Sequence, residues 1–483
     1  MTKIMFLQQI WFPLGGVMAL SAALKNEGHK TRVAVGNDEK ILKELEQYKP
    51  DIIAFSVITS FRKFMSTMCK KIRKKGINSL IIVGGYDASF FPDIIKNLPI
   101  DALCIGEGED AIVKFANAVK NGEDYSKIDN LWVKKGEKII KNSLKPFKDV
   151  NERLFDDREI YREYDSFFRD LEFEQIMVGR GCPYRCSYCF NHKYRMLYLD
   201  VSKKYCDLRD VDNVIKECLI LKNKYNVKNI FFNDSTLGYN KSWLRDFLKK
   251  YKERVGVPFT INSTLNEVDE EFCKLIAETK NCFIIRVAFE TGNERLRKEV
   301  LNKQVSNSRC IQSIELFKKY KLKYSLSMML GLPGETLENA LETLDFAIKL
   351  SSKHSVAAIN IFKPFPKLDI TEYGVKIGQY DRKLIEDNNL IGDNVMNIYD
   401  CFRNDEEGRR ILNLSRLSYI YLNFPFMRKI IKENLIYRED NQMYRFLWKY
   451  TEAFYTLRHH VNASWQYLIK HAIKHRKKEV RGA

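Results

Sequence analysis

The sequence has no internal repeat, no low-complexity tract and no run of apolar residues long enough to cross a membrane. A membrane helix needs roughly 18 consecutive apolar residues. The most apolar N-terminal segment, residues 4–24, is interrupted by Gln8, Gln9, Pro13 and two glycines. We therefore expect a strand, a turn and a helix there rather than a signal peptide, and we expect a cytoplasmic protein.

The sequence also lacks the cysteine pattern of a disulfide scaffold. Its 11 cysteines are an odd number in a long chain, which favours reduced thiols. Eight of them occur singly, and we expect these to be small buried side chains: Cys69, Cys104, Cys206, Cys218, Cys273, Cys282, Cys310 and Cys401. The other three are clustered.

Acidic residues are too few to balance the basic ones, so the net charge is +19. Residues 401–483 contribute strongly, with 17 Lys and Arg against 8 Asp and Glu. A basic surface attracts nucleic acid, membranes or anionic substrates, but a solvated lysine-rich surface has the same composition. We favour the solvated surface and expect no nucleic-acid partner.

The first 125 residues alternate between short apolar runs and amphipathic stretches. The runs at 3–9, 31–36, 51–57, 79–85 and 101–106 predict strands, and 14–26 and 61–75 predict helices. This pattern indicates an α/β domain with a doubly wound parallel sheet, in which ligands bind beyond the carboxyl ends of the strands. Residues 126–168 are predicted to be a linker with a hairpin near 131–141.

A second alternating series over residues 169–375 predicts a partial TIM-type (β/α)6 barrel. Its expected strands are 173–178, 229–233, 259–263, 283–290, 324–330 and 357–362, with helices such as 211–224 and 337–350 between them. The chemistry of such a barrel belongs at the carboxyl ends of its strands.

Residues 376–483 contain little Gly or Pro and predict a mostly helical C-terminal domain. Aromatic residues recur there among basic ones, a pattern more typical of a helical core than of a binding platform. These residues are Tyr444, Phe446, Trp448, Tyr450, Phe454, Tyr455, Trp465 and Tyr467.

Three thiols lie close together in the segment 179–190, which reads Gly-Arg-Gly-Cys-Pro-Tyr-Arg-Cys-Ser-Tyr-Cys-Phe. Cys182, Cys186 and Cys189 follow the first barrel strand with the spacing C-x3-C-x2-C. Thiolates are the ligands that iron–sulfur clusters prefer, and one tight loop can bring three of them to three corners of a 4Fe-4S cubane. Zinc usually needs four ligands, and only His192 is nearby. The pattern therefore favours a cluster with one iron open to chemistry.

This motif resembles that of the radical S-adenosylmethionine (radical SAM) superfamily. Three later segments resemble strand-end elements of the same superfamily: 231–235, 289–293 and 329–336. The resemblance implies reductive cleavage of S-adenosylmethionine (SAM) to a 5′-deoxyadenosyl radical. The residues expected to contact SAM are Tyr188, Phe190, Asn233, Asp234, Thr264 and Glu290. The segment Pro364–Leu368 departs from the family's usual Pro-Gly-Thr turn.

The N-terminal segments 13–15, 28–29, 83–87 and 106–109 resemble the cobalamin-binding domain of one subgroup of this superfamily. The resemblance implies cobalamin at Pro13, Leu14, Gly15, Ser56, Ile58, Thr59, Gly84, Gly85, Tyr86, Gly106, Glu107 and Gly108. Many such domains supply an axial histidine from a D-x-H-x-x-G loop, which is missing here. We expect a cobalt without a protein imidazole, since His29 is the domain's only histidine. The alternative is a vestigial domain that only caps the barrel.

The expected function is a cobalamin-dependent radical SAM methyltransferase. We expect a small-molecule or lipid substrate, an electron donor such as flavodoxin or ferredoxin, and a monomer. The alternatives are a cyclisation or rearrangement without methyl transfer, an RNA-modifying methylthiotransferase, and a non-catalytic sensor. Methylthiotransferases carry three further cysteines in the N-terminal domain, where only Cys69 and Cys104 occur.

Overall fold

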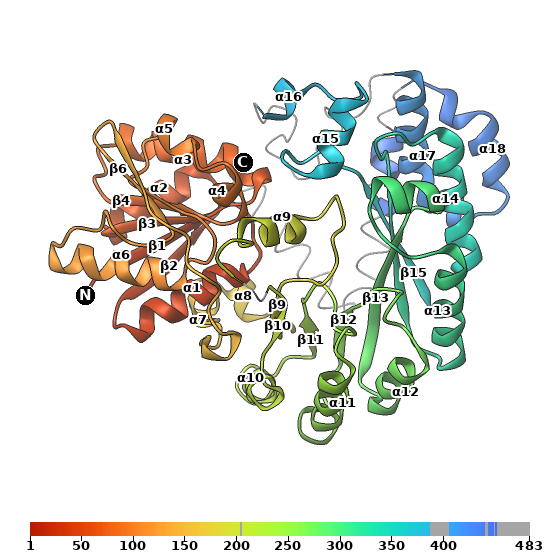
Figure 1. The fold of residues 1–483 in the computed structure, drawn as a ribbon, viewed down its shortest axis with the longest axis horizontal. Coiled ribbons are helices and arrows are strands. Elements are labelled where there is room, and N and C mark those ends of the chain that lie inside the picture. The colour runs from red at the N-terminus through yellow and green to blue at the C-terminus, as the bar shows by residue number, and fades with distance from the viewer. Residues whose placement is uncertain (203–204, 387–404, 440–442, 449, 452–483) are drawn as a thin grey trace.

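The computed structural model describes residues 1–202, 205–386, 405–439, 443–448 and 450–451. In this part of the chain, one sheet lies in the N-terminal half and a second sheet lies beside it (Figure 1). None of the described helices is both long and apolar enough to cross a membrane. Residues 387–404 and 452–483 of the predicted helical domain, with Cys401 and the aromatic residues from Phe454 onward, lie outside the described residues.

The N-terminal sheet has seven strands in the order β2-β1-β3-β4-β5-β6-β7, and the first five are parallel. The order 2-1-3-4-5 is that of a doubly wound fold, which confirms the prediction. The strands are β1 (Lys3–Gln8), β2 (Lys30–Val35), β3 (Ile52–Ser56), β4 (Leu80–Gly84), β5 (Ala102–Cys104), β6 (Leu131–Lys135) and β7 (Lys138–Lys141).

Helices cover both faces of this sheet, because successive side chains of a strand point to opposite faces. Ile4 and Phe6 of β1 pack into one core, and Met5 and Leu7 pack into the other. The helices are α1 (Gly15–Asn26), α2 (Asp38–Tyr48), α3 (Arg62–Lys74), α4 (Tyr86–Phe90), α5 (Ile94–Asn97) and α6 (Glu109–Asn121).

The segment 126–168 is not the simple linker that we predicted. The expected hairpin forms as β6 and β7, and β6 pairs antiparallel with β5 and so extends the N-terminal sheet. Helices α7 (Glu159–Arg162) and α8 (Ser166–Arg169) then bury aromatic side chains in the core beneath α1 and α6. The sequence did not reveal this packing because each helix has a single turn, which is too short to show a helical period.

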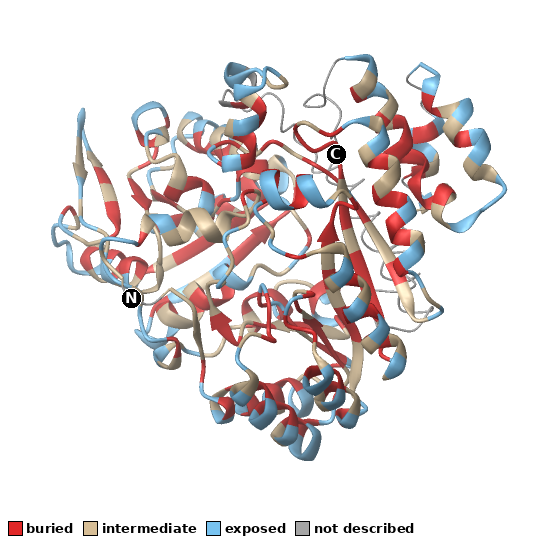
Figure 2. Cartoon of the chain, turned by 45° about the vertical axis from the view of Figure 1, so that its right-hand side comes forward, coloured by how far each residue is buried: buried red, intermediate tan, exposed pale blue. Residues whose placement is uncertain are grey.

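The second sheet has six parallel strands in the order β15-β14-β13-β12-β11-β8, as predicted. They are β8 (Phe173–Ile176), β11 (Asn229–Phe232), β12 (Phe259–Asn262), β13 (Cys282–Glu290), β14 (Tyr324–Leu330) and β15 (Ser355–Ile361). Most of their residues are buried (Figure 2). The covering helices are α10 (Val211–Asn223), α11 (Lys241–Lys250), α12 (Glu270–Thr279), α13 (Asn307–Lys319) and α14 (Leu337–Leu350).

The described C-terminal helices pack on this second sheet unit. They are α15 (Asp369–Lys376), α16 (Arg382–Glu386), α17 (Glu406–Asn423) and α18 (Met427–Glu433). The hydroxyl of Tyr421 in α17 donates a 2.6 Å hydrogen bond to Asp345 of α14. Tyr444 and Trp448 are buried in the same core, whereas Phe446 and Tyr450 are exposed. The prediction of an aromatic core is therefore confirmed for only part of that stripe.

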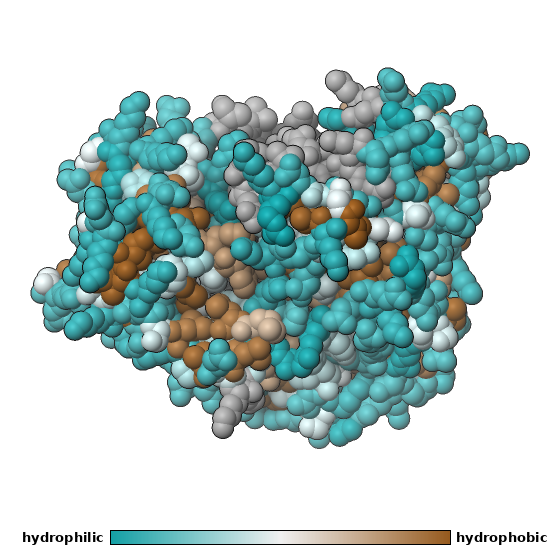
Figure 3. Space-filling view, turned by 45° about the horizontal axis from the view of Figure 1, so that its top comes forward, coloured by the Kyte–Doolittle hydropathy of each residue, from teal (hydrophilic) through white to brown (hydrophobic). Residues whose placement is uncertain are grey.

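The remaining surface is mostly hydrophilic. On the face drawn in Figure 3, apolar side chains gather in patches over the N-terminal half, at the left, with smaller groups at the right. Among the singly placed cysteines, five are buried as predicted, namely Cys69, Cys104, Cys218, Cys273 and Cys310, but Cys206 and Cys282 are partly exposed.

Candidate active site between the two sheets

The three clustered cysteines occupy one loop, residues 181–189, which we call the cysteine loop. It follows β9 (Gly179–Arg180), which pairs antiparallel with β10 (Asp207–Leu208), and it ends at α9 (Phe190–Leu197). Gly181 has a φ of +85°, and a Cβ there would overlap the carbonyl oxygen of Tyr205. Glycine is needed at this position because β10 and the residues before it run against the loop.

The three thiols are half-buried and influence one another electrostatically. Burial, and then the neighbouring thiols, raise the pKa of Cys182 to about 12. Burial also raises the pKa of Cys186 and of Cys189, and the ammonium of Lys303 opposes this effect at Cys186. Neutral thiols lose their protons when a metal binds, so the loop offers three soft ligands in one place.

This donor set fits a cluster better than a single ion. Within the described ranges, no three His, Cys, Asp or Glu side chains converge on a point that could hold one metal ion. A single zinc would need ligand sulfurs at about 2.3 Å from a common centre. In a cubane each cysteine binds a different iron, so three thiols can be spread around a larger core.

Glu290 lies beside the cysteine loop at the carboxyl end of β13, as predicted. It is buried and has a φ of +68°, a left-handed conformation that is costly for a non-glycine residue and that clusters at functional sites. The hydroxyl of Tyr188 donates a 2.7 Å hydrogen bond to Glu290 Oε1, and Lys303 Nζ lies 3.2 Å from the same oxygen. The structure therefore brings together two predicted SAM residues and adds Lys303.

The other predicted SAM residues are arranged differently. Asn233 is exposed at the end of β11 and donates a 2.7 Å hydrogen bond to Gln175. Asp234 is buried, and its carboxylate accepts 2.8 Å hydrogen bonds from the backbone N–H groups of Val178 and Gly179. Asp234 therefore fixes the entry to the cysteine loop instead of facing open space. Thr264 is half-buried after β12.

A cavity of about 480 Å³ separates the two sheet units, and we call it the inter-sheet cavity. Ten of the twelve predicted cobalamin residues line it: Leu14, Gly15, Ser56, Ile58, Gly84, Gly85, Tyr86, Gly106, Glu107 and Gly108. Pro13 and Thr59 are not among its lining residues, and Thr59 is buried. The carboxyl ends of β1, β3, β4 and β5 therefore face one space, as the doubly wound topology requires.

The opposite wall of the inter-sheet cavity comes from the second half of the chain. It is formed by Gln175, Met177, Arg180, Gly181, Asn191, Tyr194, Tyr205, Asn233 and Ser235. Gly181 precedes Cys182 directly, and Asn191 follows Cys189 by two residues. The cavity thus reaches from the glycine-rich strand ends to the borders of the cysteine loop.

Glycines shape the N-terminal wall of the inter-sheet cavity. Gly85 has a φ of +97°, and a Cβ there would lie 2.6 Å from the carbonyl oxygen of Val57. The lining includes no histidine. His29 instead bonds through its two ring nitrogens to the N–H of Thr2 and to Asn117. An apolar cavity with small residues on its floor fits a large flat ligand such as cobalamin, bound without an imidazole from this domain.

Aromatic side chains bridge the two units around α9. The ring of Phe190 stacks on Phe90 at 5.4 Å and lies 6.1 Å from Tyr86, while Tyr194 lies 5.3 Å from Tyr86. Phe190, predicted at the SAM site, therefore contacts the predicted cobalamin wall. Phe147 stacks on Tyr198 at 3.7 Å.

Charged contacts join the same surfaces. Arg180, between the two glycines that precede Cys182, forms ion pairs with Glu107 and Glu109. Sequence reasoning missed Arg180, Tyr194, Tyr198 and Lys303. The position of Arg180 inside the cysteine motif, and the i, i+4 spacing of Tyr194 and Tyr198 on a helix, were the available signals. Nothing in the sequence placed Lys303.

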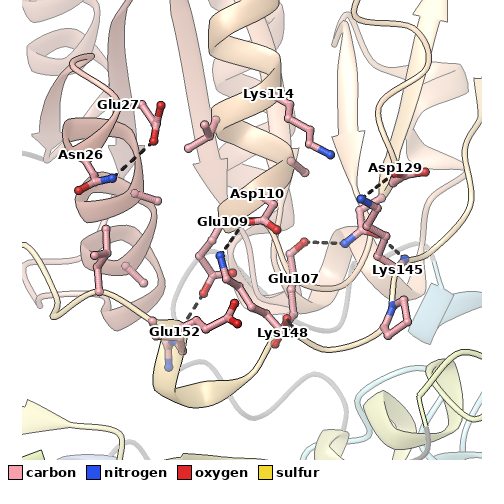
Figure 4. A pocket seen from close by; sticks show the side chains of 18 of the residues that line it. Asn26, Glu27, Glu107, Glu109, Asp110, Lys114, Asp129, Lys145, Lys148 and Glu152 are labelled. Carbon is pink, nitrogen blue, oxygen red and sulfur yellow. Dashed lines mark hydrogen bonds and ion pairs between the residues drawn. The ribbon is translucent and has the colours of Figure 1, made fainter. Parts of the chain in front are cut away.

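A second cavity of about 420 Å³ lies behind this ion-pair layer, between α1, α6 and the segment 145–154 (Figure 4). It shares Ala19 and the four charged residues Glu107, Glu109, Arg153 and Arg180 with the inter-sheet cavity. Its other charged side chains are largely paired with one another, as in the contact of Lys148 with Asp110 at 3.1 Å. The ion pairs of Arg180 therefore form a wall between the two cavities.

The segment that departs from the family's turn keeps a glycine-like backbone. Lys367 has a φ of +69°, so a lysine occupies the conformation that suits glycine at this position. Leu368 is buried beside Phe362 and Ile370. Residues 364–368 therefore still form a turn, although their sequence differs from that of the family.

Comparison with known proteins agrees with these two halves. A family model described as the radical SAM superfamily matches residues 176–347, and one described as the B12 binding domain matches residues 7–116. An uncharacterized methyltransferase of Pyrococcus horikoshii is 27% identical over 373 residues, which cover 75% of this chain and 78% of that protein.

Two solved structures share the fold. The radical SAM methyltransferase TsrM of Kitasatospora setae, with cobalamin and a [4Fe-4S] cluster bound, has a TM-score of 0.59 at 17% identity and covers 78% of this chain and 77% of its own. The cobalamin-dependent radical enzyme OxsB, with aqua-cobalamin bound, has a TM-score of 0.63 at 16% identity and covers 95% and 72%.

Proposed function

Because the chain belongs to the radical SAM superfamily and carries a B12 binding domain, we propose that it is a cobalamin-dependent radical SAM methyltransferase acting on a small molecule or lipid. When bound, the cofactors supply the electron that cleaves SAM to a 5′-deoxyadenosyl radical and the methyl group that is transferred. The observation that carries the proposal is the inter-sheet cavity, which joins the glycine-rich strand ends to the borders of the cysteine loop.

The roles of this chain's residues follow from their chemistry. Cys182, Cys186 and Cys189 would hold three irons and leave the fourth for the amino and carboxylate groups of SAM. Glu290 would accept hydrogen bonds from the SAM ammonium or ribose through its second oxygen, since Oε1 already accepts from Tyr188. A buried carboxylate makes strong hydrogen bonds of this kind.

The predicted cobalamin residues would hold the second cofactor on the N-terminal wall. Small residues at Gly84, Gly85 and Gly106 leave room for close approach of a flat ring. The aromatic contacts of α9 would exclude water from the space between the two cofactors, which protects a reactive radical. The substrate would enter this space beside Asn233 and Ser235.

The proposal includes partners that the chain must meet in solution. Reduction of the cluster needs an electron donor, which we expect to be a flavodoxin or ferredoxin, and we expect the protein to act as a monomer. The paired charges and the largely apolar lining of the inter-sheet cavity favour a small-molecule or lipid substrate over a folded RNA.

The decisive experiment reconstitutes the cluster without oxygen and counts iron, sulfide and cobalamin per chain. Incubation with SAM, a reductant and candidate substrates should then release 5′-deoxyadenosine together with a methylated product. Deoxyadenosine without a methylated product would favour a cyclisation or rearrangement. A protein that binds cobalamin and iron but releases no nucleoside with any reductant would act as a sensor instead.

A further inference from the structure

A chain of polar contacts runs from the cysteine loop to a buried lysine. Tyr188 lies between Cys186 and Cys189 in sequence, and its hydroxyl donates a 2.7 Å hydrogen bond to Glu290 Oε1. Lys303 Nζ lies 3.2 Å from that oxygen and 3.4 Å from the Tyr188 hydroxyl. Only 13% of the Lys303 side chain and 9% of the Glu290 side chain are exposed.

The backbone around Lys303 is bonded directly to the cysteine loop. The N–H of Ser187 donates a 3.0 Å hydrogen bond to the carbonyl of Leu301, and the Ser187 hydroxyl donates one of 2.6 Å to the carbonyl of Val300. The side chain of Asn302 donates 2.8 Å to the carbonyl of Arg185. The segment that carries Lys303 is thus fixed to the cysteine loop on both sides of Cys186.

A buried arginine holds the other side of this segment. Arg297 is fully buried. Its guanidinium donates hydrogen bonds to the carbonyl of Phe289, at 2.9 Å, and to the carbonyl of Val305, at 3.1 Å. The N–H of Lys303 donates 3.0 Å to the carbonyl of Arg297. The backbone of Lys303 is therefore fixed on this side as well, so the point from which its side chain extends does not depend on the ion pair.

A salt bridge in such surroundings is costly to build. Burying two charges forfeits their hydration, and this cost often exceeds the attraction that the pair regains. If the only role of residue 303 were to stabilise the fold, an apolar side chain would serve at least as well, because it has no charge to desolvate. Here the pair adjoins three thiols that would become anionic on binding iron. Both contacts of the Glu290 carboxylate are to Oε1, and among the described residues none bonds its second oxygen.

We propose that Lys303 is a positioning residue for the cluster and SAM. Its ammonium holds the Glu290 carboxylate in place beside Tyr188 of the cysteine loop, and it would offset part of the negative charge of three thiolates and their cluster. The inference rests on the proposed function and deepens it. No covalent step passes through Lys303.

The test compares K303Q with K303R and with K298Q in the reconstituted protein. Lys298 is an exposed lysine five residues earlier, so K298Q removes the same charge from the surface. Two measurements need no turnover: the midpoint potential of the cluster, and the binding of SAM to the oxidised protein by equilibrium dialysis. Iron is counted first in every variant.

K303Q should keep its iron, since the thiols bind it, but its cluster should have a more negative potential, because a nearby cation favours the reduced, more anionic cluster. SAM binding should weaken by about tenfold or more, the loss expected when a charge-assisted hydrogen bond is removed. K303R should restore the potential, and K298Q should match the wild type in both measurements.

The double variant E290Q/K303Q separates a role through Glu290 from general damage. Its SAM affinity should equal that of E290Q alone, since residues that act as a unit are not additive. A K303Q protein with wild-type potential and affinity would overturn the inference, and so would a K303R protein with the K303Q potential. If the wild type takes up no iron, the proposed function fails, which is a different result.

Discussion

The hydroxyl of Tyr198 accepts a 2.8 Å hydrogen bond from the backbone N–H of Glu107. Tyr198 follows α9 and therefore the cysteine loop, whereas Glu107 lies in the loop after β5. Gly106 has a φ of +76°, and a Cβ there would overlap the Tyr198 hydroxyl. Two segments from the two halves of the chain are thus fitted against each other at the edge of the inter-sheet cavity.

This fit predicts that Gly106→Ala damages cobalamin binding. Alanine would have to adopt a left-handed backbone conformation, and its methyl group would overlap the Tyr198 hydroxyl. We expect these two effects together to lower the free energy of unfolding by about 2 to 3 kcal/mol. Gly122→Ala is the matched control, because Gly122 also has a left-handed φ, +68°, but has open space around it. Thermal unfolding and cobalamin retention on gel filtration would measure both effects.

Tyr198→Phe in the same background tests whether the overlap is the cause. The double variant should recover part of the lost stability, since the phenyl ring lacks the oxygen that the new methyl group meets. Equal stability of G106A and G122A would contradict this account.

The cysteine loop yields the second prediction. Alanine at Cys182, Cys186 or Cys189 should abolish release of 5′-deoxyadenosine and lower the iron content, because each thiol would bind a different iron. Cys218→Ala is the control, since Cys218 is buried in the helix α10 core away from the loop. Iron analysis and chromatography of the nucleoside would follow each variant, and undiminished iron in C186A would argue against a cubane at this site.

Much of this architecture could be predicted from the sequence because periodicity and strand-end residues are local signals. The strands of both sheets begin and end within a few residues of their predicted positions, and Glu290 lies where a strand ends against the cysteine loop. The cluster motif is local as well. Local patterns of this kind can be recognised in the sequence without knowledge of the fold.

Contacts between segments far apart in the chain could not be predicted from the sequence. Arg180 meets Glu107 and Glu109 across 71 or more residues, and no period or motif links them. The resemblance of segment 231–235 to a family element predicted that Asp234 contacts SAM, but its carboxylate turns to the N–H groups of Val178 and Gly179. A strand-end carboxylate can cap a neighbouring loop as well as bind a ligand, and only the fold decides between them.

A buried ion network between the two units gives the third prediction. Arg158 beside α7 lies 2.9 Å from Glu217 of α10, which also pairs with Arg209 at 2.7 Å, and none of the three is more than 7% exposed at its side chain. Glu217→Ala would leave two buried guanidinium groups short of a partner, at a cost of about 3 to 5 kcal/mol. Glu271→Ala, which removes an exposed partner of Arg245, should cost less than about 1 kcal/mol. Thermal unfolding would compare them, and equal losses would contradict a structural role for the network.

Asp234 gives the last prediction, a pH dependence of stability. Burial raises the pKa of its carboxyl from 3.8 to about 7, against the opposing effect of the two backbone N–H donors. Since the folded state holds this proton more tightly than the unfolded state, the stabilising effect of protonation is complete below pH 3.8 and is lost as the pH rises to about 7. The loss is on the order of 4 kcal/mol at most. Asp234→Asn should remove it.

The difference in thermal midpoint between wild type and D234N should therefore shrink from pH 5 to about pH 7 and level off above it, with wild type more stable at the acid end. Asparagine offers one acceptor to two N–H groups, so D234N starts from a lower stability at pH 5, and the other titrating groups cancel in the difference. Asp246→Asn, at an exposed carboxylate paired with Lys250 at 3.1 Å, controls for removal of a surface charge. Parallel pH profiles for wild type and D234N would show that Asp234 stays ionised in the fold, held so by the N–H groups at the entrance to the cysteine loop.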